Sequence, residues 1–418
     1  MYAIFDKALK NIVVSGDLLV FDATGRGHRY GDSQGLPVAF RFTSRTAPLK
    51  IALDADLYLG EAFMNGDIEM QEGTIYDLLA LLLRNIEGRT VPAALRYMDR
   101  VRKVLKRVYE YNPTWRAKAN VAHHYDLSDS LYDLFLDGDR QYSCAYFESP
   151  DATLEEAQLA KKRHLAAKLD VKPGMRVLDI GSGWGGLGLY LAEQCGANVT
   201  GVTLSEEQHR VSNERALQRG LFDRVKFQLL DYRHLNEPFD RIVSVGMFEH
   251  VGVVHYAEFF RKIRQLLKPD GVALLHSINR SDGPGATSRW INKYIFPGGS
   301  IPALSEVVPQ LEKYGLYLTD VEILRLHYAE TLRHWRERFL ARRDEAKRIY
   351  DERFCRMWEF YLAASETAFR YSALNNFQIQ FTRSQHALPI TRNYMIEAED
   401  RLRAPAARER RLKSVPAE

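Results

Sequence analysis

The chain has 418 residues, a net charge of +4 and 46% hydrophobic residues, which is enough for two or three domains with sizeable cores. The three cysteines, Cys144, Cys195 and Cys355, are odd in number and far apart. They exclude a disulfide framework and fit a reducing compartment. The longest apolar run is too short to cross a membrane and the N-terminus lacks a signal-peptide core, so we expect a soluble chain.

The first 95 residues predict a small α+β unit. Short apolar stretches bounded by Gly, Asp and Pro are typical of strands, and the leucine-rich segment 74–86 is typical of a helix. The expected strands are residues 16–23, 37–44 and 49–55.

Basic residues gather after this unit. Residues 95–118 carry eight Lys or Arg, with apolar side chains at helical spacing, which predicts a basic helical linker over residues 96–121. Such a helix can bind an anionic lipid surface, or it is a plain linker with a solvated charged face. The tail, residues 401–418, is basic and rich in Ala and Pro, and is predicted to be disordered.

Strands and helices alternate from residue 175 on. This alternation predicts a doubly wound α/β domain, with a parallel sheet covered by helices on both faces, over residues 122–400. After Ser300 the chain is predicted to be helical and aromatic-rich, forming a lid. The expected strands are 175–180, 198–204, 224–232, 240–248 and 271–278, and the expected helices are 185–194, 205–220 and 256–267.

The glycine-rich stretch "VLDIGSGWGG", residues 177–186, ends a buried strand. A dinucleotide-binding loop reads G-x-G-x-x-G, whereas this one reads G-x-G-x-G-G and has Asp179 before its first glycine. It resembles the loop of S-adenosylmethionine (SAM) methyltransferases, where the ligand end at the turn is a cationic amino acid rather than a phosphate. The resemblance implies a Rossmann-like methyltransferase domain.

The next two strands end in polar residues. "GVTLSEEQ" offers Thr203, Leu204 and Gln208 where many methyltransferases carry an acid, although Ser205 and Gln208 also fit a helix capping box. At the end of the third strand, Asp231 is expected to accept a hydrogen bond from an adenine amino group.

Six ordered motifs between about residue 123 and residue 395 resemble the cyclopropane-fatty-acyl-phospholipid synthases. The stretch "GEAFMNGDIEM" also resembles that family's N-terminal lipid-binding domain, which assigns this role to residues 1–95. The six motifs are "QYSCAYF", "KPGMRVLDIGSGWGG", "GVTLSEEQ", "DRIVSVGMFEHVG", "LKPDGVALLHSI" and "WINKYIFPGGSIP". The cofactor-binding residues expected from the loop, the strand ends and the resemblance are Tyr142, Ser143, Asp179, Gly181, Gly183, Gly185, Thr203, Leu204, Gln208, Asp231 and Tyr232.

The resemblance implies an activity: transfer of a methylene group from SAM to a cis double bond of an unsaturated phospholipid acyl chain, through a carbocation and a bound bicarbonate base. It also implies a cytoplasmic enzyme at the inner face of an anionic membrane, as a monomer or a homodimer. The alternatives are a relative that gives a methyl-branched or methylene product or methylates small amines, and a lipid-binding protein without catalysis. No nucleic-acid partner is expected, because no amide motif for base methylation is present.

The family's bicarbonate site maps onto five residues of this chain. The resemblance implies backbone contacts from Cys144 and Ile278, side-chain contacts from Glu249 and His276, and a hydroxyl contact from Tyr328. Glu249 and His276 are each expected to end a strand and to face the cofactor crevice. A metal site is the rival interpretation of this pair, but no H-x-x-x-H or C-x-x-C motif accompanies it, so no metal is expected.

Cys144 is thus predicted to act through its amide rather than as a nucleophile. In "YLAASETAFR", Ser365 stands where the family often has a cysteine, which predicts a slightly more polar wall for the acyl channel. A carbocation needs a dry site with aromatic walls. The aromatic candidates for these walls are Tyr142, Tyr146, Phe147, Trp184, Phe248, Trp290, Tyr294 and Phe296.

Overall fold

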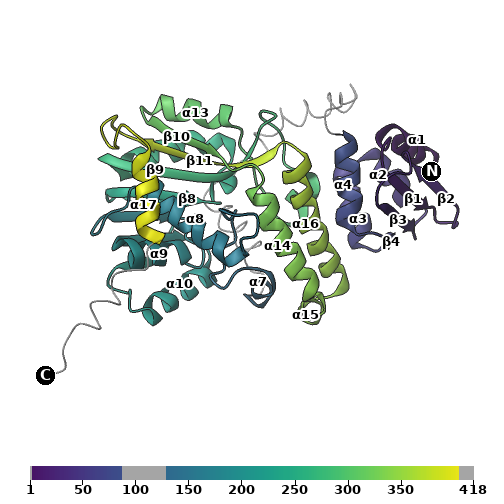
Figure 1. The fold of residues 1–418 in the computed structure, drawn as a ribbon, viewed down its shortest axis with the longest axis horizontal. Coiled ribbons are helices and arrows are strands. Elements are labelled where there is room, and N and C mark those ends of the chain that lie inside the picture. Colours follow the sequence, from purple (N-terminus) through teal and green to yellow (C-terminus); the bar gives the residue numbers. More distant parts are fainter. Residues whose placement is uncertain (1, 87–128, 404–418) are drawn as a thin grey trace.

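Two β-sheets organise the protein, a four-stranded one near the N-terminus and a seven-stranded one in the larger part of the chain (Figure 1). A computed structural model describes residues 2–86 and 129–403. The predicted basic linker, residues 96–121, lies outside the described residues. So does the predicted tail, except for its first three residues, which belong to the helix α17 (Asn393–Arg403).

The N-terminal sheet has the strand order β2-β1-β3-β4, with β1 and β3 parallel. The predicted strand over residues 49–55 is wrong: these residues form most of the helix α2 (Ala47–Leu53). Pro48 stands in its first turn, and Ala47, Pro48 and Ile51 are buried together on one helical face. The strands are β1 (Asp17–Phe21), β2 (Gly27–Tyr30), β3 (Pro37–Phe42) and β4 (Ile68–Glu72), and the other helices are α1 (Tyr2–Ile12), α3 (Ala55–Met64) and α4 (Ile75–Ile86).

The large sheet has the strand order β10-β11-β9-β8-β5-β6-β7, and its five predicted strands are confirmed and run parallel. Two further strands, β10 and β11, were not predicted, because the chain after Ser300 was expected to be helical. The antiparallel β11 inserts between β10 and β9. The strands are β5 (Arg176–Ile180), β6 (Asn198–Thr203), β7 (Val225–Leu229), β8 (Phe239–Val245), β9 (Leu267–Arg280), β10 (Tyr317–Ile323) and β11 (Leu374–Thr382).

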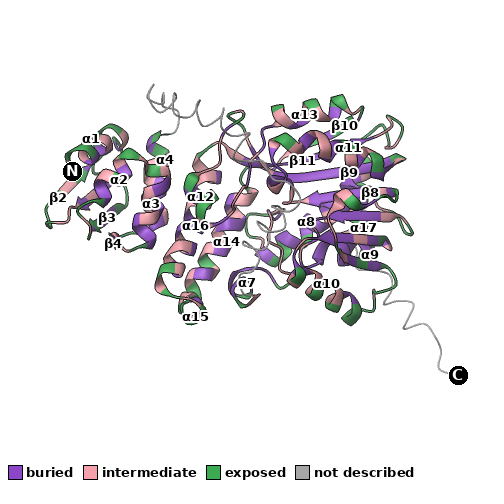
Figure 2. Ribbon diagram, turned by 180° about the vertical axis from the view of Figure 1, so that it is seen from behind, coloured by how far each residue is buried: buried purple, intermediate pink, exposed green. Residues whose placement is uncertain are grey.

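Helices cover both faces of this sheet, which confirms the predicted doubly wound α/β fold. One face packs against α8, α9 and α10, and the other against α11 and α13. The strands between these layers are buried along most of their length (Figure 2). The covering helices are α8 (Leu154–Lys168), α9 (Gly186–Cys195), α10 (Glu206–Gln218), α11 (Tyr256–Leu266) and α13 (Leu304–Lys313).

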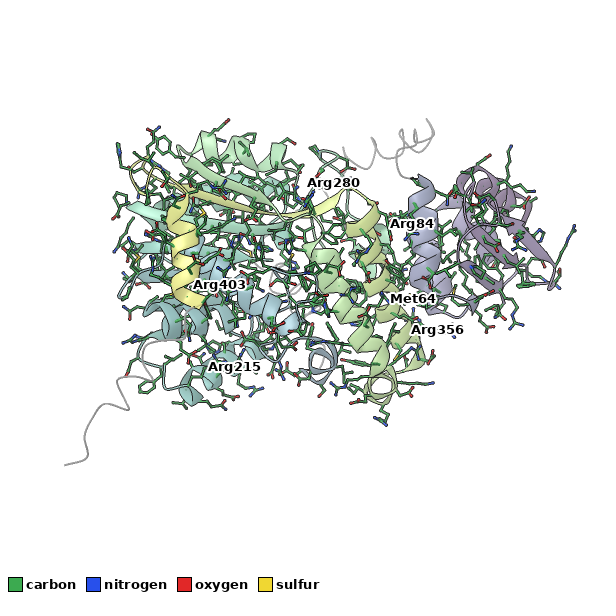
Figure 3. The ribbon with its side chains drawn as sticks, viewed as in Figure 1. Met64, Arg84, Arg215, Arg280, Arg356 and Arg403 are labelled. Carbon is green, nitrogen blue, oxygen red and sulfur yellow. The ribbon has the colours of Figure 1, made fainter. Side chains whose placement is uncertain are left out.

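A layer of helices lies between the two sheets and joins them into one body (Figure 1). One apolar cluster runs from the N-terminal strands through α3 and α4 into α14 and α16. Arg84 of α4 donates to the Tyr371 hydroxyl at 2.6 Å, and Met64 and Arg356 lie at the same junction (Figure 3). The layer contains α7 (Asp129–Phe135), α12 (Arg289–Tyr294), α14 (His327–Ala341), α15 (Arg343–Ile349) and α16 (Glu352–Tyr371).

Within the described ranges, no helix combines the length and the apolar character that a membrane span requires.

Candidate functional site

Two cavities meet at the carboxyl ends of the central strands. The loop cavity, about 160 Å³, lies over the glycine-rich turn and the ends of β6 and β7. The junction cavity, about 760 Å³, runs from the ends of β8 and β9 to the N-terminal helices α3 and α4. Tyr142, Ser143, Gly246 and His250 line both cavities, so the two share a wall.

The glycine-rich turn brings the backbone to the wall of the loop cavity. Gly181 has a φ of +81°, and a side chain there would come within 2.7 Å of Met247, which also lines the cavity. Gly183 also lines it. Gly185 does not: a Cβ there would lie 2.6 Å from the Phe227 ring, so this glycine allows α9 to start close to the sheet rather than to a ligand.

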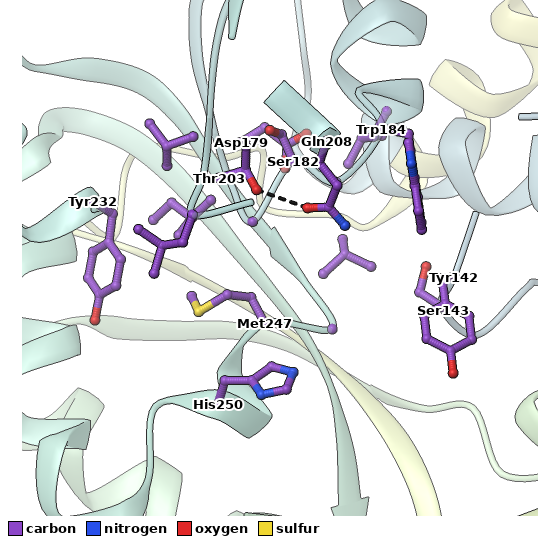
Figure 4. A pocket seen from close by; sticks show the side chains of 18 of the residues that line it. Tyr142, Ser143, Asp179, Ser182, Trp184, Thr203, Gln208, Tyr232, Met247 and His250 are labelled. Atoms are coloured by element: carbon purple, nitrogen blue, oxygen red, sulfur yellow. Dashed lines mark hydrogen bonds between the residues drawn. The ribbon is translucent and has the colours of Figure 1, made fainter. Parts of the chain in front are cut away.

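Asp179 places a buried acceptor in the loop cavity. Its Oδ2 has no hydrogen-bond partner among the described residues, and neither does the Ser182 hydroxyl beside it (Figure 4). Burial raises the pKa of the Asp179 carboxyl to about 7. A buried carboxylate without a partner is unfavourable. This arrangement therefore suits a cationic ligand group.

Thr203, Leu204 and Gln208 line the same cavity, as predicted for the end of β6. The Thr203 hydroxyl donates to Gln208 Oε1 at 2.9 Å (Figure 4). The Gln208 backbone N–H donates to Ser205 Oγ at 3.3 Å. Only this half of the predicted capping box forms, because the Gln208 side chain turns toward Thr203. Gln208 thus both begins α10 and lines the cavity.

Asp231 and Tyr232 line the far side of the loop cavity, and Figure 4 shows Tyr232 opposite Tyr142. Arg233 donates to both Asp231 carboxyl oxygens, at 2.9 Å and 2.7 Å. Despite burial, these bonds hold the pKa of Asp231 below its usual value. Oδ1 also accepts the Arg233 backbone N–H at 3.0 Å, whereas Oδ2 retains capacity for a second donor.

Glu249 enters the junction cavity just beyond β8. All five residues predicted for the anion site line this cavity: Cys144, Glu249, His276, Ile278 and Tyr328. Glu249 Oε1 accepts the Ile278 backbone N–H at 2.6 Å, so the amide predicted to contact the anion is already bonded to the carboxyl group. Glu249 Oε2 has no partner among the described residues, and burial raises the pKa of this side chain to about 7.

His276 does not end its strand, contrary to the prediction. β9 continues to Arg280 because the antiparallel β11 keeps pairing with it, whereas the parallel pairing with β8 stops at His276. Gln378, directly opposite on β11, donates from its Nε2 to His276 Nδ1 at 3.2 Å. This bond leaves the ring proton on Nε2, which faces no partner in the described structure. Burial lowers the pKa of His276 to about 3, so the ring is neutral.

Ser300 and Asn376 belong to this polar cluster and were not predicted. Both line the junction cavity, and both are buried with a side-chain oxygen that has no partner in the described residues. The Ser300 backbone N–H donates to the Glu249 carbonyl at 2.8 Å, and Asn376 pairs with Ile278 across the strands. Ser300 falls within the motif "WINKYIFPGGSIP", the one signal that could have found it. Asn376 and Gln378 lie in an unpredicted strand.

Cys144 lines the junction cavity with a buried, protonated thiol. Its side chain is 1% exposed, its Sγ donates to the Ala145 carbonyl at 3.3 Å, and burial raises its pKa far above the ordinary thiol range. A thiol in this state is a poor nucleophile. Ser365, which stands where the resembled family often has a cysteine, also lines this cavity.

Half of the aromatic candidates do line a cavity. Tyr142, Trp290 and Phe296 line the junction cavity, and Trp184 lines the loop cavity. The others are packed elsewhere: Tyr146 stacks on His164 and His327, Phe147 on His334 and Phe248 on Tyr256, and the Tyr294 hydroxyl donates to Glu61. Three other aromatic residues that line the junction cavity were not predicted: Phe360, Tyr361 and Phe369.

Comparison with known proteins matches residues 113–379 to the family described as mycolic acid cyclopropane synthetase. The cyclopropane-fatty-acyl-phospholipid synthase of Escherichia coli K12 is 40% identical over 334 residues, which cover 80% of this chain and 85% of that protein. The tuberculostearic acid methyltransferase UfaA1 of Mycobacterium tuberculosis is 37% identical over 332 residues, covering 76% of this chain and 77% of that protein. The structure of the mycolic acid cyclopropane synthase CmaA1 with SAH and CTAB superposes with a TM-score of 0.61 at 35% identity, covering 65% of this chain and 99% of CmaA1.

Proposed function

Because the chain belongs to the mycolic acid cyclopropane synthetase family and is a SAM-dependent methyltransferase, we propose that it acts on a cis double bond in an unsaturated phospholipid acyl chain and closes a cyclopropane ring there. One observation carries this proposal. An apolar cavity of about 760 Å³ ends, beside the cofactor loop, in buried polar atoms of Glu249 and His276 that have no partner among the described residues.

The residues of the loop cavity fit SAM. Asp179 is a buried acceptor that suits the ammonium group of the amino-acid end, and Asp231 retains acceptor capacity for the adenine amino group. Thr203, Leu204 and Gln208 lie between them along the strand ends. SAM supplies an electrophilic methyl group when it is bound. The wall shared by both cavities is where this group would meet a lipid.

The junction cavity fits an acyl chain. Leucine and isoleucine side chains of the N-terminal helices and aromatic side chains of α12 and α16 line it, which excludes water from a reacting carbocation. Aromatic faces also stabilise a nearby cation by roughly 0.5–2 kcal/mol each. We therefore assign residues 1–95 to lipid binding and residues 122–400 to catalysis.

The polar cluster handles the proton that ring closure releases from the added methyl group. His276 Nε2–H and the Ser300 hydroxyl are buried donors suited to bicarbonate, which would supply a weakly nucleophilic base. Glu249, neutral up to about pH 7, adds no fixed negative charge that would capture the cation. Tyr328 and the Cys144 amide complete the proposed cradle.

Lipid mass spectrometry tests the proposal. Cells that express the chain should gain one CH₂ on unsaturated phospholipid acyl chains, and cells that express Glu249→Gln should not. Gas chromatography of the fatty methyl esters then separates a cyclopropane from a methyl-branched product. If SAM raises the melting temperature of the pure protein but no lipid changes, the protein binds the cofactor without acting on these lipids.

We also propose that the enzyme docks on an anionic membrane surface on the cytoplasmic side, as the basic residues between 95 and 118 suggest. Co-sedimentation with anionic vesicles should weaken as salt is raised, because the Debye length falls to about 3 Å at 1 M salt. Binding that is independent of salt would contradict this docking mode. A homodimer stays a prediction, and light scattering of the pure protein tests it.

A further inference from the structure

Lys161 of α8 is a buried cation at the wall of the loop cavity. Its side chain is 1% exposed, and its Nζ donates to Gln141 Oε1 at 2.8 Å and to Ser143 Oγ at 2.7 Å. Neither acceptor is charged. No carboxylate in the described part of the chain forms an ion pair with this ammonium group, whereas carboxylates do pair with Lys162 and Lys168 of the same helix.

The contrast with the other buried lysines of α8 is informative. Lys162 pairs with Asp139 at 2.6 Å, and Lys168 pairs with Asp320 and Glu322. Charged groups inside proteins are normally paired, because leaving one unpaired loses its hydration without compensation. Burial lowers the pKa of Lys161 to about 8, so it still carries its charge at neutral pH. Asp137 and Asp139 act on this ammonium group without forming an ion pair with it, so it can still take a charged hydrogen-bond partner from a ligand.

Asp179 presents the opposite case in the same cavity. Its Oδ2 is buried and has no hydrogen-bond partner in the described residues. The charge of Lys161 acts on this carboxyl group, although the two side chains form no ion pair. One cavity thus holds a buried cation and a buried acid that are close but not bonded. That pattern complements a zwitterion.

We propose that Lys161, together with the Ser143 hydroxyl, recognises the carboxylate of the cofactor's amino-acid end, while Asp179 takes the ammonium group. The proposal rests on the SAM site proposed above and adds a residue that neither the sequence motifs nor the family resemblance singled out.

The hydrogen bonds leave suitable donors for a carboxylate. An ammonium group has three N–H donors, and Gln141 and Ser143 account for two of those of Lys161. Ser143 Oγ accepts from Lys161, so its own proton is directed elsewhere. Ser143 lines the cavity, and its hydroxyl together with the third ammonium N–H can bond to a carboxylate.

Calorimetric binding of SAM and of decarboxylated SAM, which lacks only the carboxylate, tests the proposal without any lipid. The unmodified chain should bind SAM more tightly by at least about tenfold, since hydrogen bonds to charged groups are worth that much. Lys161→Met should weaken SAM binding by a similar factor and leave binding of the decarboxylated compound unchanged. Equal affinity of the unmodified chain for the two compounds would overturn the proposal.

Lys162→Met is the matched control, since Lys162 is a buried neighbour that pairs with Asp139 and does not line the cavity. It should keep the ratio of the two affinities. If Lys161→Met also keeps that ratio and weakens both ligands alike, Lys161 only supports the loop and the proposal fails. Should Lys161→Met not fold, Ser143→Ala decides: the preference for SAM must fall in that variant. Because no lipid is present, these outcomes are independent of whether the enzyme makes cyclopropanes.

Discussion

The two cavities share a wall but handle charge in opposite ways. In the loop cavity, burial raises the pKa of Asp179 to about 7, but the charge of Lys161 favours its ionised form, so the two side chains offer opposite charges to the ends of one zwitterion. In the junction cavity, burial keeps Glu249 protonated up to about pH 7 and His276 neutral down to about pH 3. One cavity is prepared for a charged ligand, whereas burial favours the neutral forms of the acid and the histidine at the polar end of the other.

The difference follows from what covers the sheet edge. A glycine-rich turn and the ends of β6 and β7 line the loop cavity, so backbone groups and buried polar side chains remain in reach of a ligand. Apolar helices from both parts of the chain cover the junction cavity and remove water from it. A single sheet edge can therefore border both a cavity for a charged ligand and an apolar cavity when the covering elements differ.

Glu249→Gln should separate the roles of the two cavities most clearly. The change keeps the shape of the side chain but removes a proton donor and acceptor, so turnover should fall by at least about 10²-fold. SAM affinity should be unchanged, because Glu249 does not line the loop cavity. Steady-state rates on lipid vesicles and calorimetric SAM binding measure the two effects. Parallel losses of rate and SAM affinity would mean that the two cavities do not act separately.

The same variant should have a pH-dependent advantage in stability. Folding raises the pKa of Glu249 from 4.5 to about 7, so the folded parent loses stability relative to the variant as pH rises between these values. The advantage should be absent below pH 4.5 and full above about pH 7, where it approaches about 3 kcal/mol at roughly 1.4 kcal/mol per pKa unit. Urea unfolding of both proteins at the two pH extremes measures it. An equal difference at both extremes would show that Glu249 ionises normally in the fold.

Gly60→Ala should disturb the junction cavity and leave the loop cavity unchanged. A Cβ at this buried helical position would lie 2.5 Å from Trp290 Nε1 and 2.7 Å from the Phe360 ring, both in the wall of the junction cavity. Overpacking of this kind destabilises by about 1–3 kcal/mol. Turnover on lipid should fall while SAM affinity stays the same. Gly138→Ala, where no atom lies near the added carbon, is the control. A loss of SAM affinity in Gly60→Ala would show that the cavities are mechanically coupled.

Gln378→Leu should lower turnover by about tenfold, the scale of losing one buried hydrogen bond with its orienting effect. A leucine cannot donate to His276 Nδ1, so the ring proton is no longer held on Nε2. NMR of the ring nitrogens reports this change of tautomer. Gln380→Leu is the matched control, since Gln380 is buried on the same strand but bonds to the Tyr394 hydroxyl away from the cavity. Equal activity losses in both variants would reduce the effect to general destabilisation.

Cys144→Ser should have the smallest effect. Its thiol is buried and protonated, and only its amide is assigned a role, so most of the turnover should remain. Rates on vesicles, together with circular dichroism to check the fold, measure this. Complete inactivation with the fold intact would instead indicate that the Cys144 thiol acts as a nucleophile.

The loop cavity was largely predictable because its residues follow strand ends within short motifs. Asp179, Thr203 and Asp231 were found in this way, since apolar strands and turn glycines mark those positions directly. Gly185 was predicted together with its neighbours because of its spacing, but in the structure it faces the Phe227 ring and does not line the loop cavity.

The junction cavity was harder to predict because distant segments assemble it. β11 alternates Phe377, Ile379 and Phe381 with polar residues, which is a strand pattern, but it was missed because the whole chain after Ser300 was predicted to be helical. Tyr146 belongs to a site motif, but its ring stacks on histidines of α8 and α14. Such partners depend on the tertiary fold and leave no local signal in the sequence.

The apolar cluster that joins the N-terminal unit to α16 also has a consequence for the synthesis of the protein. α4 ends at Ile86 and leaves the ribosome early, whereas its partner α16 starts at Glu352. At about 5–20 residues per second, the delay between them is roughly 15–50 s. During that time the face of α4 that packs against α16 has no partner on the nascent chain. This helix is therefore where the unfinished protein most needs a chaperone.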